Sequence, residues 1–470
     1  MAKAKSKKIT LEEALVPVEE QPYEVPENWC WIKLGTISSI ISKGTTPKGG
    51  KTAYVDEGID FLRVENINDD GTICHDDMMH VTEETHTGFL KRSILEENDI
   101  LVSIAGTLGK TAIVKNDDLP LNTNQAVAFV RLRDNGEISR EYIRYAIDTP
   151  VIQNILMSKT KVTAIPNLTL EIISECLIPL PPLSEQQQIV EQIESLFAKL
   201  DEAKEKALSV VESFESRKIA ILNNAFNGLY STDWREKHHC TLDDWKDRKI
   251  NEICIPRAGF AFNSKKFTES GIQIIRMGNL YAGKLNLSRS PVFYDISDVD
   301  DNIIKRSMVH DGDILLTLTG TKYKRDYGYA VCIEGEHELL VNQRILCLSP
   351  TEKIDKEYLL YYLRSEIFRD IFFSNETGGV NQGNVSSKFV ENIEIKLPSI
   401  EEQKEISKIL KNILTKEEQA KELAEVVIEQ IELMKKSILD KAFRGELGTN
   451  NPEDESAIEL LKIILDKGDC

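Results

Sequence analysis

The feature that most constrains this 470-residue chain is that it repeats itself. Residues 180–187 read LPPLSEQQ and residues 397–404 read LPSIEEQK, which places the second copy 217 residues after the first (397 against 180). Residues 225–228 (AFNG) and 442–445 (AFRG) keep the same separation. Self-similarity at a fixed distance indicates one structural module that is present twice.

Shorter landmarks recur upstream in the same order. First copy against second, they are Arg63 and Asn66 against Arg276 and Asn279, 98–101 against 312–315, Gly106-Thr107 against Gly320-Thr321, and Asn124-Gln125 against Asn342-Gln343. The separation between equivalent landmarks changes only slightly, from 213 residues (63 to 276) to 218 residues (124 to 342). The two copies have therefore diverged mainly between the landmarks.

Each module begins with short runs of apolar and β-branched residues, bounded by Gly, Asn, Asp and Pro. Runs such as 100–104, 126–130 and 314–318 are typical of strands. Helical patterns over 139–157 and 356–372 lie among them. The first part of each module is therefore expected to be a mixed α/β (α+β) domain.

Each module ends with a long helical pattern. Pro181-Pro182 interrupts the preceding segment, and Ser184 followed by Gln187 resembles a capping box. Apolar residues then recur every three or four positions as far as 214, which is a heptad pattern, and the second copy continues it in the same phase. Gly228 and Gly445 are suited to end the two helices.

We expect these helices to pack antiparallel on each other as a coiled coil with pseudo-twofold symmetry, since both seams are long, narrow and matched in phase. The alternative is two unrelated surface helices, each packed on its own domain. The residues expected in the helix pair are Ile189, Ile193, Leu196, Leu200, Ala203, Ala207, Ile413, Ala420, Ala424, Val427 and Ile431.

Charge and motifs narrow the function. A net charge of −19 argues against non-specific nucleic-acid binding through a broad positive field, although local basic patches remain compatible with DNA binding. Residues 106–111 (GTLGKT) end like a P-loop, but Ile104 stands where the first glycine is required. Without a catalytic motif, we expect recognition and not catalysis, with no catalytic residue.

Metal binding and membrane insertion are not expected either. His238-His239-Cys240 has no second ligand cluster, so we interpret it as a polar linker and expect no metal site. The basic N-terminus leads into ITLEEAL and not into an apolar segment, and no apolar run approaches the ~20 residues of a membrane span. We therefore expect a cytoplasmic chain without a membrane anchor.

Polar loops in both copies offer a different chemistry. A basic, hydroxyl-rich loop covers 43–52, and a basic–aromatic cluster covers 322–327. Amide-rich or basic loops, 158–167 and 378–384, precede the long helices. Lys and Arg neutralise phosphates, and Arg, Asn and Gln can read base edges. A solvated surface is the plain alternative for each loop alone.

These doubled motifs carry a family resemblance. The chain resembles the specificity (S) subunit of Type I restriction–modification systems over nearly its whole length. The resemblance rests on the doubled LPPLSEQQQI and LPSIEEQKEI, each opening a long helix that closes with Ala-Phe-x-Gly, and on 44–47 and 257–262, which look like openings of the family's target recognition domains.

The resemblance implies this organisation: an N-terminal extension (1–26), target recognition domain 1 (27–180), a central conserved helix (181–230), target recognition domain 2 (231–397), a C-terminal conserved helix (398–448) and an acidic tail (449–470). We interpret both terminal segments as flexible or partner-contacting extensions.

The resemblance also implies the activity and the partners. Such a subunit is not an enzyme. Each recognition domain reads one half of a bipartite site in double-stranded DNA, and the paired helices set the spacer. The helices dock two methyltransferase subunits, and two restriction (motor–nuclease) subunits complete the complex. S-adenosylmethionine, ATP and Mg²⁺ belong to these partners, so no cofactor is expected on this chain. The rival hypothesis is a helical scaffold that binds two protein partners and no nucleic acid.

We take the following residues as candidate DNA contacts, with Arg325 the candidate for reading a guanine. In the first domain they are Thr45, Thr46, Lys48, Lys51, Arg63, Asn66, Thr107, Lys110 and Lys161; in the second they are Phe260, Asn263, Lys265, Arg276, Asn279, Lys322, Lys324, Arg325, Tyr327, Asn381 and Gln382. Residues shared by two domains that read different sequences are better suited to touch phosphate or to hold the fold.

Overall fold

The computed structural model describes residues 9–133, 136–160, 166–297, 299–335, 337–379 and 381–467, with only the backbone for Lys51 and Lys467. Its internal contacts divide the chain into two compact units. Unit 1 consists of Met1–Lys206 and Val427–Cys470, and unit 2 consists of Ala207–Val426. Both units combine strands and helices, which confirms the predicted mixed content.

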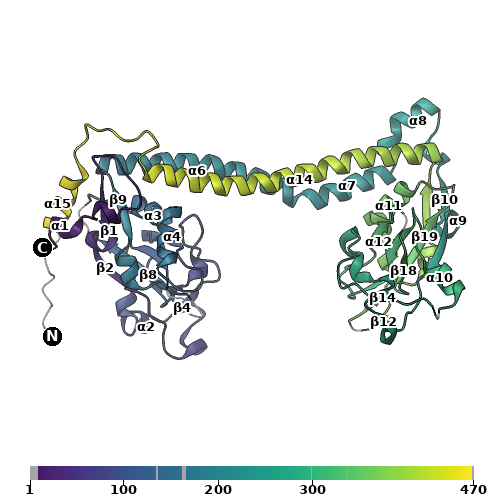
Figure 1. The fold of residues 1–470 in the computed structure, drawn as a ribbon, viewed down its shortest axis with the longest axis horizontal. Helices are drawn as coiled ribbons and strands as arrows, with labels where there is room; N and C mark the ends of the chain where they lie inside the picture. Colours follow the sequence, from purple (N-terminus) through teal and green to yellow (C-terminus); the bar gives the residue numbers. More distant parts are fainter. Residues whose placement is uncertain are drawn as a thin grey trace. The chain divides into compact units, whose positions relative to one another are not determined.

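Unit 1 contains two sheets and a short ladder (Figure 1). The central antiparallel sheet has the order β2-β8-β5-β6, and the second sheet has the order β4-β3-β7 with β3 and β7 parallel. The strands are β1 (Cys30–Lys33), β2 (Ser38–Lys43), β3 (Ile59–Leu62), β4 (Met79–Val81), β5 (Ile100–Ser103), β6 (Thr111–Ile113), β7 (Leu121–Thr123), β8 (Val127–Leu132) and β9 (Leu177–Leu180). Strands β1 and β9 pair just before the long helix begins.

Unit 2 repeats the central sheet, adds one strand to the second sheet, and contains a further short ladder of β16 with β20. Its central sheet is β11-β19-β15-β17, its second sheet is β12-β14-β13-β18 with β13 and β18 parallel, and β10 pairs with β21. The strands are β10 (Lys246–Lys249), β11 (Cys254–Ala258), β12 (Phe267–Thr268), β13 (Ile272–Ile275), β14 (Phe293–Tyr294), β15 (Ile314–Thr317), β16 (Thr319–Gly320), β17 (Ala330–Cys332), β18 (Leu339–Val341), β19 (Ile345–Pro350), β20 (Gly383–Asn384) and β21 (Glu394–Leu397).

The inner strands β5 and β15 of the central sheets are buried on both faces. In β5, Ile100 and Val102 pack toward the helices, whereas Leu101 packs in a separate cluster with the second sheet. In β15, Leu316 likewise packs toward the helices, and Leu315 packs in a separate cluster with the second sheet. Because successive side chains of a strand point to opposite faces, such strands are apolar throughout, as the sequence of both runs shows.

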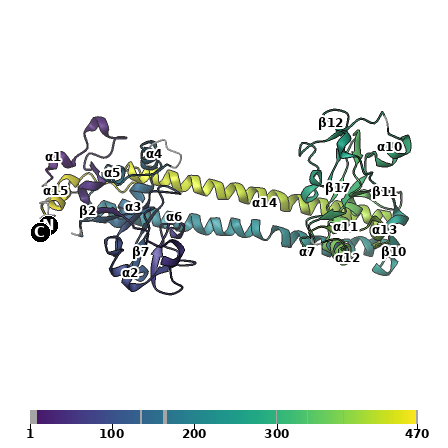
Figure 2. The same ribbon diagram turned by 90° about the horizontal axis from the view of Figure 1, so that it is seen from below.

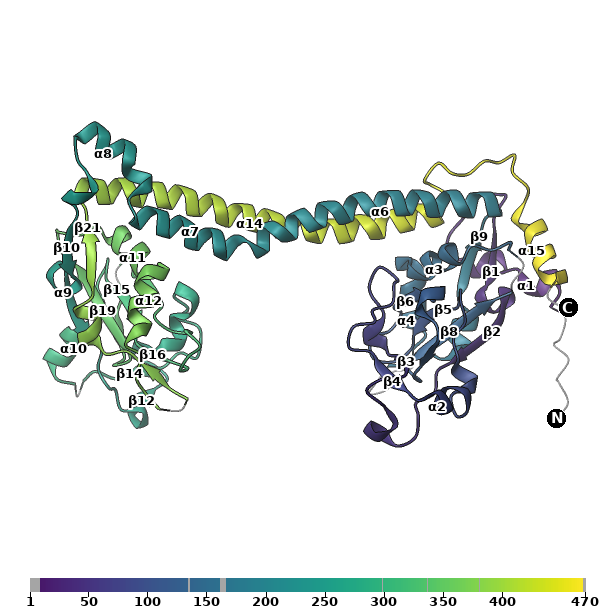
Figure 3. The ribbon, with the colours of Figure 1, turned by 180° about the vertical axis from the view of Figure 1, so that it is seen from behind.

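The helical stretches predicted over 139–157 and 356–372 are each two helices (Figure 3). Thr149 separates α3 (Arg140–Asp148) from α4 (Pro150–Ser158), and Ser365 separates α11 (Lys356–Arg364) from α12 (Glu366–Ser374). Both hydroxyl residues are extended and cap the second helix of the pair, which ends the first one. The other short helices are α2 (Glu83–Thr87), α5 (Leu170–Ser174), α8 (Thr232–His238), α9 (Ile250–Ile253), α10 (Asp301–Ser307) and α13 (Ser387–Glu391).

The long helices differ in continuity between the copies. Helix α14 runs without a break over Ile400–Phe443, whereas the first copy is divided at Ser213 into α6 (Leu183–Glu212) and α7 (Phe214–Phe226). Helix α6 begins one residue before Ser184, so Ser184 is not its N-cap; its hydroxyl bonds Asp454 instead. Gly228 and Gly445 follow the helix ends with positive φ, as predicted.

Inside each unit, segments of the long helices contact each other in antiparallel register (Figure 2). In unit 1, Lys204 pairs with Glu432 and Asp201 pairs with Lys435. In unit 2, Arg217 pairs with Glu417 at 2.7 Å, and Lys421 lies over the ring of Phe214. In each unit, a later residue of the first helix contacts an earlier residue of α14, so the two helices run in opposite directions.

The predicted packing residues are only partly buried. Ile189, Ile193, Ala207, Ala424 and Ile431 are buried, and Leu196, Leu200 and Ile413 are half-buried. Ala203, Ala420 and Val427 are exposed, which corrects the prediction at these three positions. An α-helix has 3.6 residues per turn, so a strict seven-residue repeat drifts around its surface by ~20° per heptad.

The two terminal segments are not loose extensions where the structure describes them. Helix α1 (Leu11–Ala14) contacts α15 (Ala457–Lys467) (Figure 1). Ala14, Leu461 and Ile464 are at most 1% exposed and belong to the main core of unit 1. Their apolar spacing lies within short, charged segments, which is why composition alone suggested flexibility.

Candidate nucleic-acid interface

The doubled Glu-Gln motif anchors each long helix to the unit that precedes it in the chain. The carbonyl oxygen of the Gln186 side chain accepts from the backbone N–H of Ser139 at 3.0 Å, and Gln403 does the same for Asp355 at 2.8 Å. Ser139 and Asp355 are the N-caps of α3 and α11. These glutamines are at most 1% exposed, so the most recognisable motif of the sequence holds the fold.

The preceding glutamates are also buried and accept from tryptophan. Glu185 accepts from the indole of Trp29 at 2.7 Å and from Asn450 at 3.0 Å. Glu402 accepts from Trp245 at 3.1 Å and forms an ion pair with Arg235 at 2.9 Å. Burial raises the pKa of Glu185, and its hydrogen bonds to Trp29, Asn450 and Thr449 oppose that rise.

The Arg–Asn landmarks are structural as well. Asn66 accepts from the backbone N–H of Arg63 at 2.9 Å, and Asn279 accepts from that of Arg276 at 2.9 Å. Both asparagines are at most 3% exposed, which corrects their assignment as DNA contacts. Arg63 pairs with Glu65, and Arg276 donates to the carbonyl of Ser290 at 2.6 Å.

The candidates of unit 1 divide into exposed and engaged residues. Thr46, Lys48 and Thr107 are exposed, and Thr45 is half-buried. Lys110 is engaged internally: its ammonium pairs with Asp69 at 2.7 Å and donates to the carbonyl of Ile67. The Lys51 side chain and Lys161 lie outside the described residues.

Unit 2 places its two aromatic candidates in packed surroundings. Tyr327 is 1% exposed and donates its hydroxyl to Glu376 at 2.7 Å, so its hydroxyl is already engaged where the residue lines a hollow of unit 2. Phe260 is half-buried in a cluster with Phe262. Burial and the Glu376 carboxylate both raise the pKa of Tyr327.

Arg325, the candidate for reading a guanine, is also engaged within the unit. Its guanidinium contacts Glu366 at 2.9 Å and Asp370 at 3.0 Å. Lys322 donates to the carbonyl of Gly378 at 3.2 Å. The candidates that remain exposed are Asn263, Lys265, Lys324, Asn381 and Gln382.

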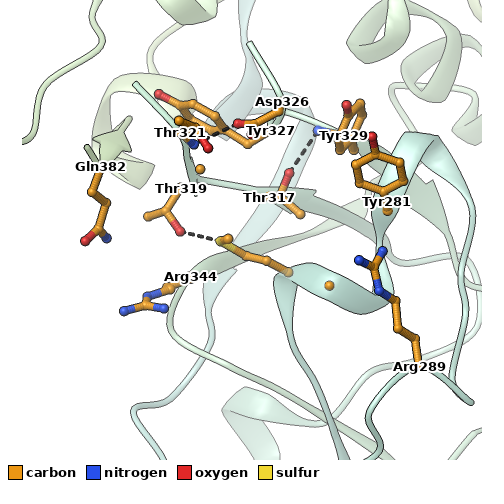
Figure 4. Close-up of a pocket in the computed structure, with 13 residues that line it drawn as sticks. Tyr281, Arg289, Thr317, Thr319, Thr321, Asp326, Tyr327, Tyr329, Arg344 and Gln382 are labelled. Atoms are coloured by element: carbon orange, nitrogen blue, oxygen red, sulfur yellow. Dashed lines mark hydrogen bonds between the residues drawn. The ribbon is translucent and has the colours of Figure 1, made fainter. Parts of the chain in front are cut away.

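A hollow of about 290 Å³ opens in unit 2 where several of these loops meet (Figure 4). Arg344 and Gln382 lie on one side of it in this view, and Tyr281 and Arg289 lie on the other. The Arg289 guanidinium lies 5.5 Å from the centre of the Tyr281 ring. This combination of arginine, amide and aromatic groups can bind a base edge or a base face.

Sequence reasoning missed Arg289 and Arg344. Arg344 directly follows the Asn342-Gln343 landmark, which was set aside as structural. The sequence does contain a signal for Arg344, because the two copies differ at this position: Ala126 follows Asn124-Gln125 in the first copy.

The described residues show no cluster of three or more His, Cys, Asp or Glu side chains that could hold a metal ion. Within the same part of the chain, no helix has the length and apolar character needed to cross a bilayer.

Comparison with known proteins gives a consistent result. The family model of the Type I restriction modification DNA specificity domain matches residues 26–212 and again 242–427. The chain is 26% identical to the Type I restriction enzyme MjaVIII specificity subunit of Methanocaldococcus jannaschii, over 91% of this chain and 95% of that one. It is 24% identical to the Type I restriction enzyme EcoKI specificity subunit of Escherichia coli K12, over 94% and 96%.

Solved structures agree in fold. The HsdS subunit from Thermoanaerobacter tengcongensis matches with a TM-score of 0.62 and 18% identity, over 92% of this chain and all of that one. A structure described as showing complex assembly and conformational transition of the type I R-M system matches with a TM-score of 0.67 and 19% identity, over 91% of this chain and all of that one.

Proposed function

Because this chain belongs to the Type I restriction modification DNA specificity family, we propose that its two units each read one half of a bipartite site in double-stranded DNA. The observation that carries the proposal is the repeated topology: each unit has an equivalent four-stranded central sheet, a second sheet with one parallel pair, and the same anchor to a long helix. A duplicated scaffold whose exposed loop residues differ suits the reading of two different half-sites.

We further propose that α6, α7 and α14 form one antiparallel coiled coil that fixes the spacer between the half-sites. The antiparallel ion pairs found inside each unit support this arrangement. In DNA-binding proteins generally, the spacing of half-sites follows from protein geometry.

The same helices are proposed to dock two methyltransferase subunits, with two restriction subunits completing a cytoplasmic complex. In this proposal the chain itself has no catalytic activity, and the partner subunits bind S-adenosylmethionine, ATP and Mg²⁺. Exposed glutamates of α14, including Glu422, Glu425 and Glu429, suit basic partner surfaces. Partners would also supply phosphate neutralisation, which the net charge of −19 makes difficult for this chain alone.

The test is to produce this chain with the methyltransferase subunit of its own system in a bacterial host without adenine methylation, and to map methyladenine across the genome. The expected result is one two-part motif with a constant spacer. A one-part motif contradicts the bipartite reading, and an absence of sequence-specific methylation favours the scaffold hypothesis.

The spacer can be tested separately. Seven residues inserted both after Lys206 and after Val426 would lengthen both helices by about 10 Å and keep their heptad phase. The expected motif keeps both halves and gains about three base pairs of spacer, at 3.4 Å per base pair. An unchanged spacer would contradict the role of the helices.

A further inference from the structure

Positions 126 and 344 have the same backbone environment in the two units. The Asn124 side chain accepts from the N–H of Ala126 at 2.9 Å, and the Asn342 side chain accepts from the N–H of Arg344 at 3.4 Å. The carbonyls of both residues accept from the next strand segment, from Ile104 at 2.8 Å and from Leu318 at 2.9 Å. The polypeptide is therefore held in place on both sides of this position in each unit.

The side chains at this shared position differ, although the backbone contacts are equivalent. Unit 1 has alanine and unit 2 has arginine, which is exposed at the rim of the hollow. A duplicated scaffold that reads two sequences must differ where a rigid backbone presents a side chain to the ligand. The position after the Asn-Gln landmark has this property.

Arg344 is also available to a ligand, unlike Arg257 and Arg325 of unit 2. Arg257 is bound to Asp313, and Arg325 is bound to Glu366 and Asp370. Among the described residues, no hydrogen bond or ion pair engages the guanidinium of Arg344. A free guanidinium can bind without first breaking an internal pair, so its donors are ready for a new acceptor.

The surroundings favour a base over a phosphate. Gln382 lies on the same side of the hollow as Arg344, and the Asp326 carboxylate lines the same hollow (Figure 4). A carboxylate repels phosphate but accepts from the amino group of cytosine, and a glutamine can pair with adenine. Arginine binds the O6 and N7 atoms of guanine with two parallel hydrogen bonds.

We propose that Arg344 is a specificity-determining residue that reads a guanine in the half-site of unit 2. The proposal rests on the DNA recognition proposed above. It replaces Arg325, which the sequence suggested for this role, and it predicts that alanine at 126 leaves unit 1 without this contact.

The experiment uses the full chain with its methyltransferase subunit and reads the genomic methyladenine motif. Arg344→Ala removes the guanidinium and reproduces the residue of unit 1, whereas Arg344→Lys keeps the charge but loses the two-pronged geometry. Arg306→Ala, at an exposed arginine of α10 that does not line the hollow, is the matched control in the same unit. Both Arg344 variants should accept other bases at one position of one half-site, with discrimination reduced about 5- to 150-fold.

The possible outcomes separate the two proposals. Relaxation at one guanine in both Arg344 variants, with the other half-site and the Arg306→Ala motif unchanged, supports the assignment. An unchanged motif in Arg344→Ala overturns it. A uniform loss of methylation that Arg344→Lys restores also overturns it, because a phosphate contact needs only charge. If the unmodified chain yields no two-part motif, the proposed function itself fails, whatever the variants do.

Discussion

The indole nitrogen of Trp29 lies 2.7 Å from a carboxylate oxygen of buried Glu185, and Trp245 repeats this relationship with Glu402 at 3.1 Å. The two copies then differ in how they satisfy the carboxylate. Glu402 faces the guanidinium of Arg235, whereas Glu185 receives the neutral donors Asn450 and Thr449 from the C-terminal segment. The same tryptophan–glutamate hydrogen bond therefore occurs in both units, but the carboxylate has a charged partner in one and neutral partners in the other.

This difference predicts unequal costs for the same substitution. Glu402→Gln leaves a buried guanidinium without its counter-charge and should lower the free energy of unfolding by about 3–5 kcal/mol. Glu185→Gln retains an amide oxygen for neutral donors and should cost about 1 kcal/mol. Urea unfolding of both variants, followed by circular dichroism, measures the difference. Equal losses would mean that the Arg235 ion pair adds nothing beyond its hydrogen bond.

The repeat made the architecture predictable from the sequence. Landmarks that recur in order, such as Asn124-Gln125 and Asn342-Gln343, mark backbone positions that the fold must keep. Strands with apolar residues on both faces and heptad helices follow from periodicity alone. The break at Ser213 did not follow, because serine is tolerated inside helices and the apolar seam continues across it.

The candidate interface was less predictable, because residue type does not show whether a side chain is already engaged. Arg325 and Lys110 have the chemistry of DNA contacts, yet carboxylates from other elements bind both. Asn66 fits a base edge in sequence and is buried in the structure. The sequence contains the difference between Arg344 and Ala126, but the structure was needed to show that the two residues have equivalent backbone contacts.

A matched pair of alanines on α14 tests the helix packing in unit 2. Ala424 is 7% exposed, whereas Ala420, one turn earlier, is exposed. Ala424→Glu buries a carboxylate against the neighbouring helix and should lower the free energy of unfolding by several kcal/mol. Ala420→Glu should change it by no more than about 0.5 kcal/mol. Thermal unfolding of the two variants decides whether the helices contact along this side.

The C-terminal helix α15 should stabilise unit 1. Leu461 is fully buried, and Leu461→Ala should cost about 2–5 kcal/mol through lost burial and the cavity that remains. Ile463 on the same helix is 38% exposed, so Ile463→Ala is the control and should have a much smaller effect. Denaturant unfolding that shows no loss for Leu461→Ala would restore the interpretation of this segment as a loose tail.

Asp148 should make the stability of unit 1 depend on pH. Burial raises the pKa of its carboxyl from 3.8 to about 6, although Arg144 and the hydroxyl of Thr111 oppose that rise. The folded chain therefore holds a proton that the unfolded chain has released. This contribution is complete below pH 3.8 and is lost as the pH rises through about 6.

Asp148→Asn cannot titrate and isolates this effect from the other carboxylates. Between pH 4 and pH 7, the free energy of unfolding of the original chain should fall relative to that of Asp148→Asn by at most about 3 kcal/mol. The 24% exposure of the Asp148 side chain makes a smaller value expected. Urea unfolding of both proteins across this range gives the difference curve. A curve of opposite slope would mean that the 3.2 Å contact with Arg144 outweighs burial and keeps the carboxylate ionised.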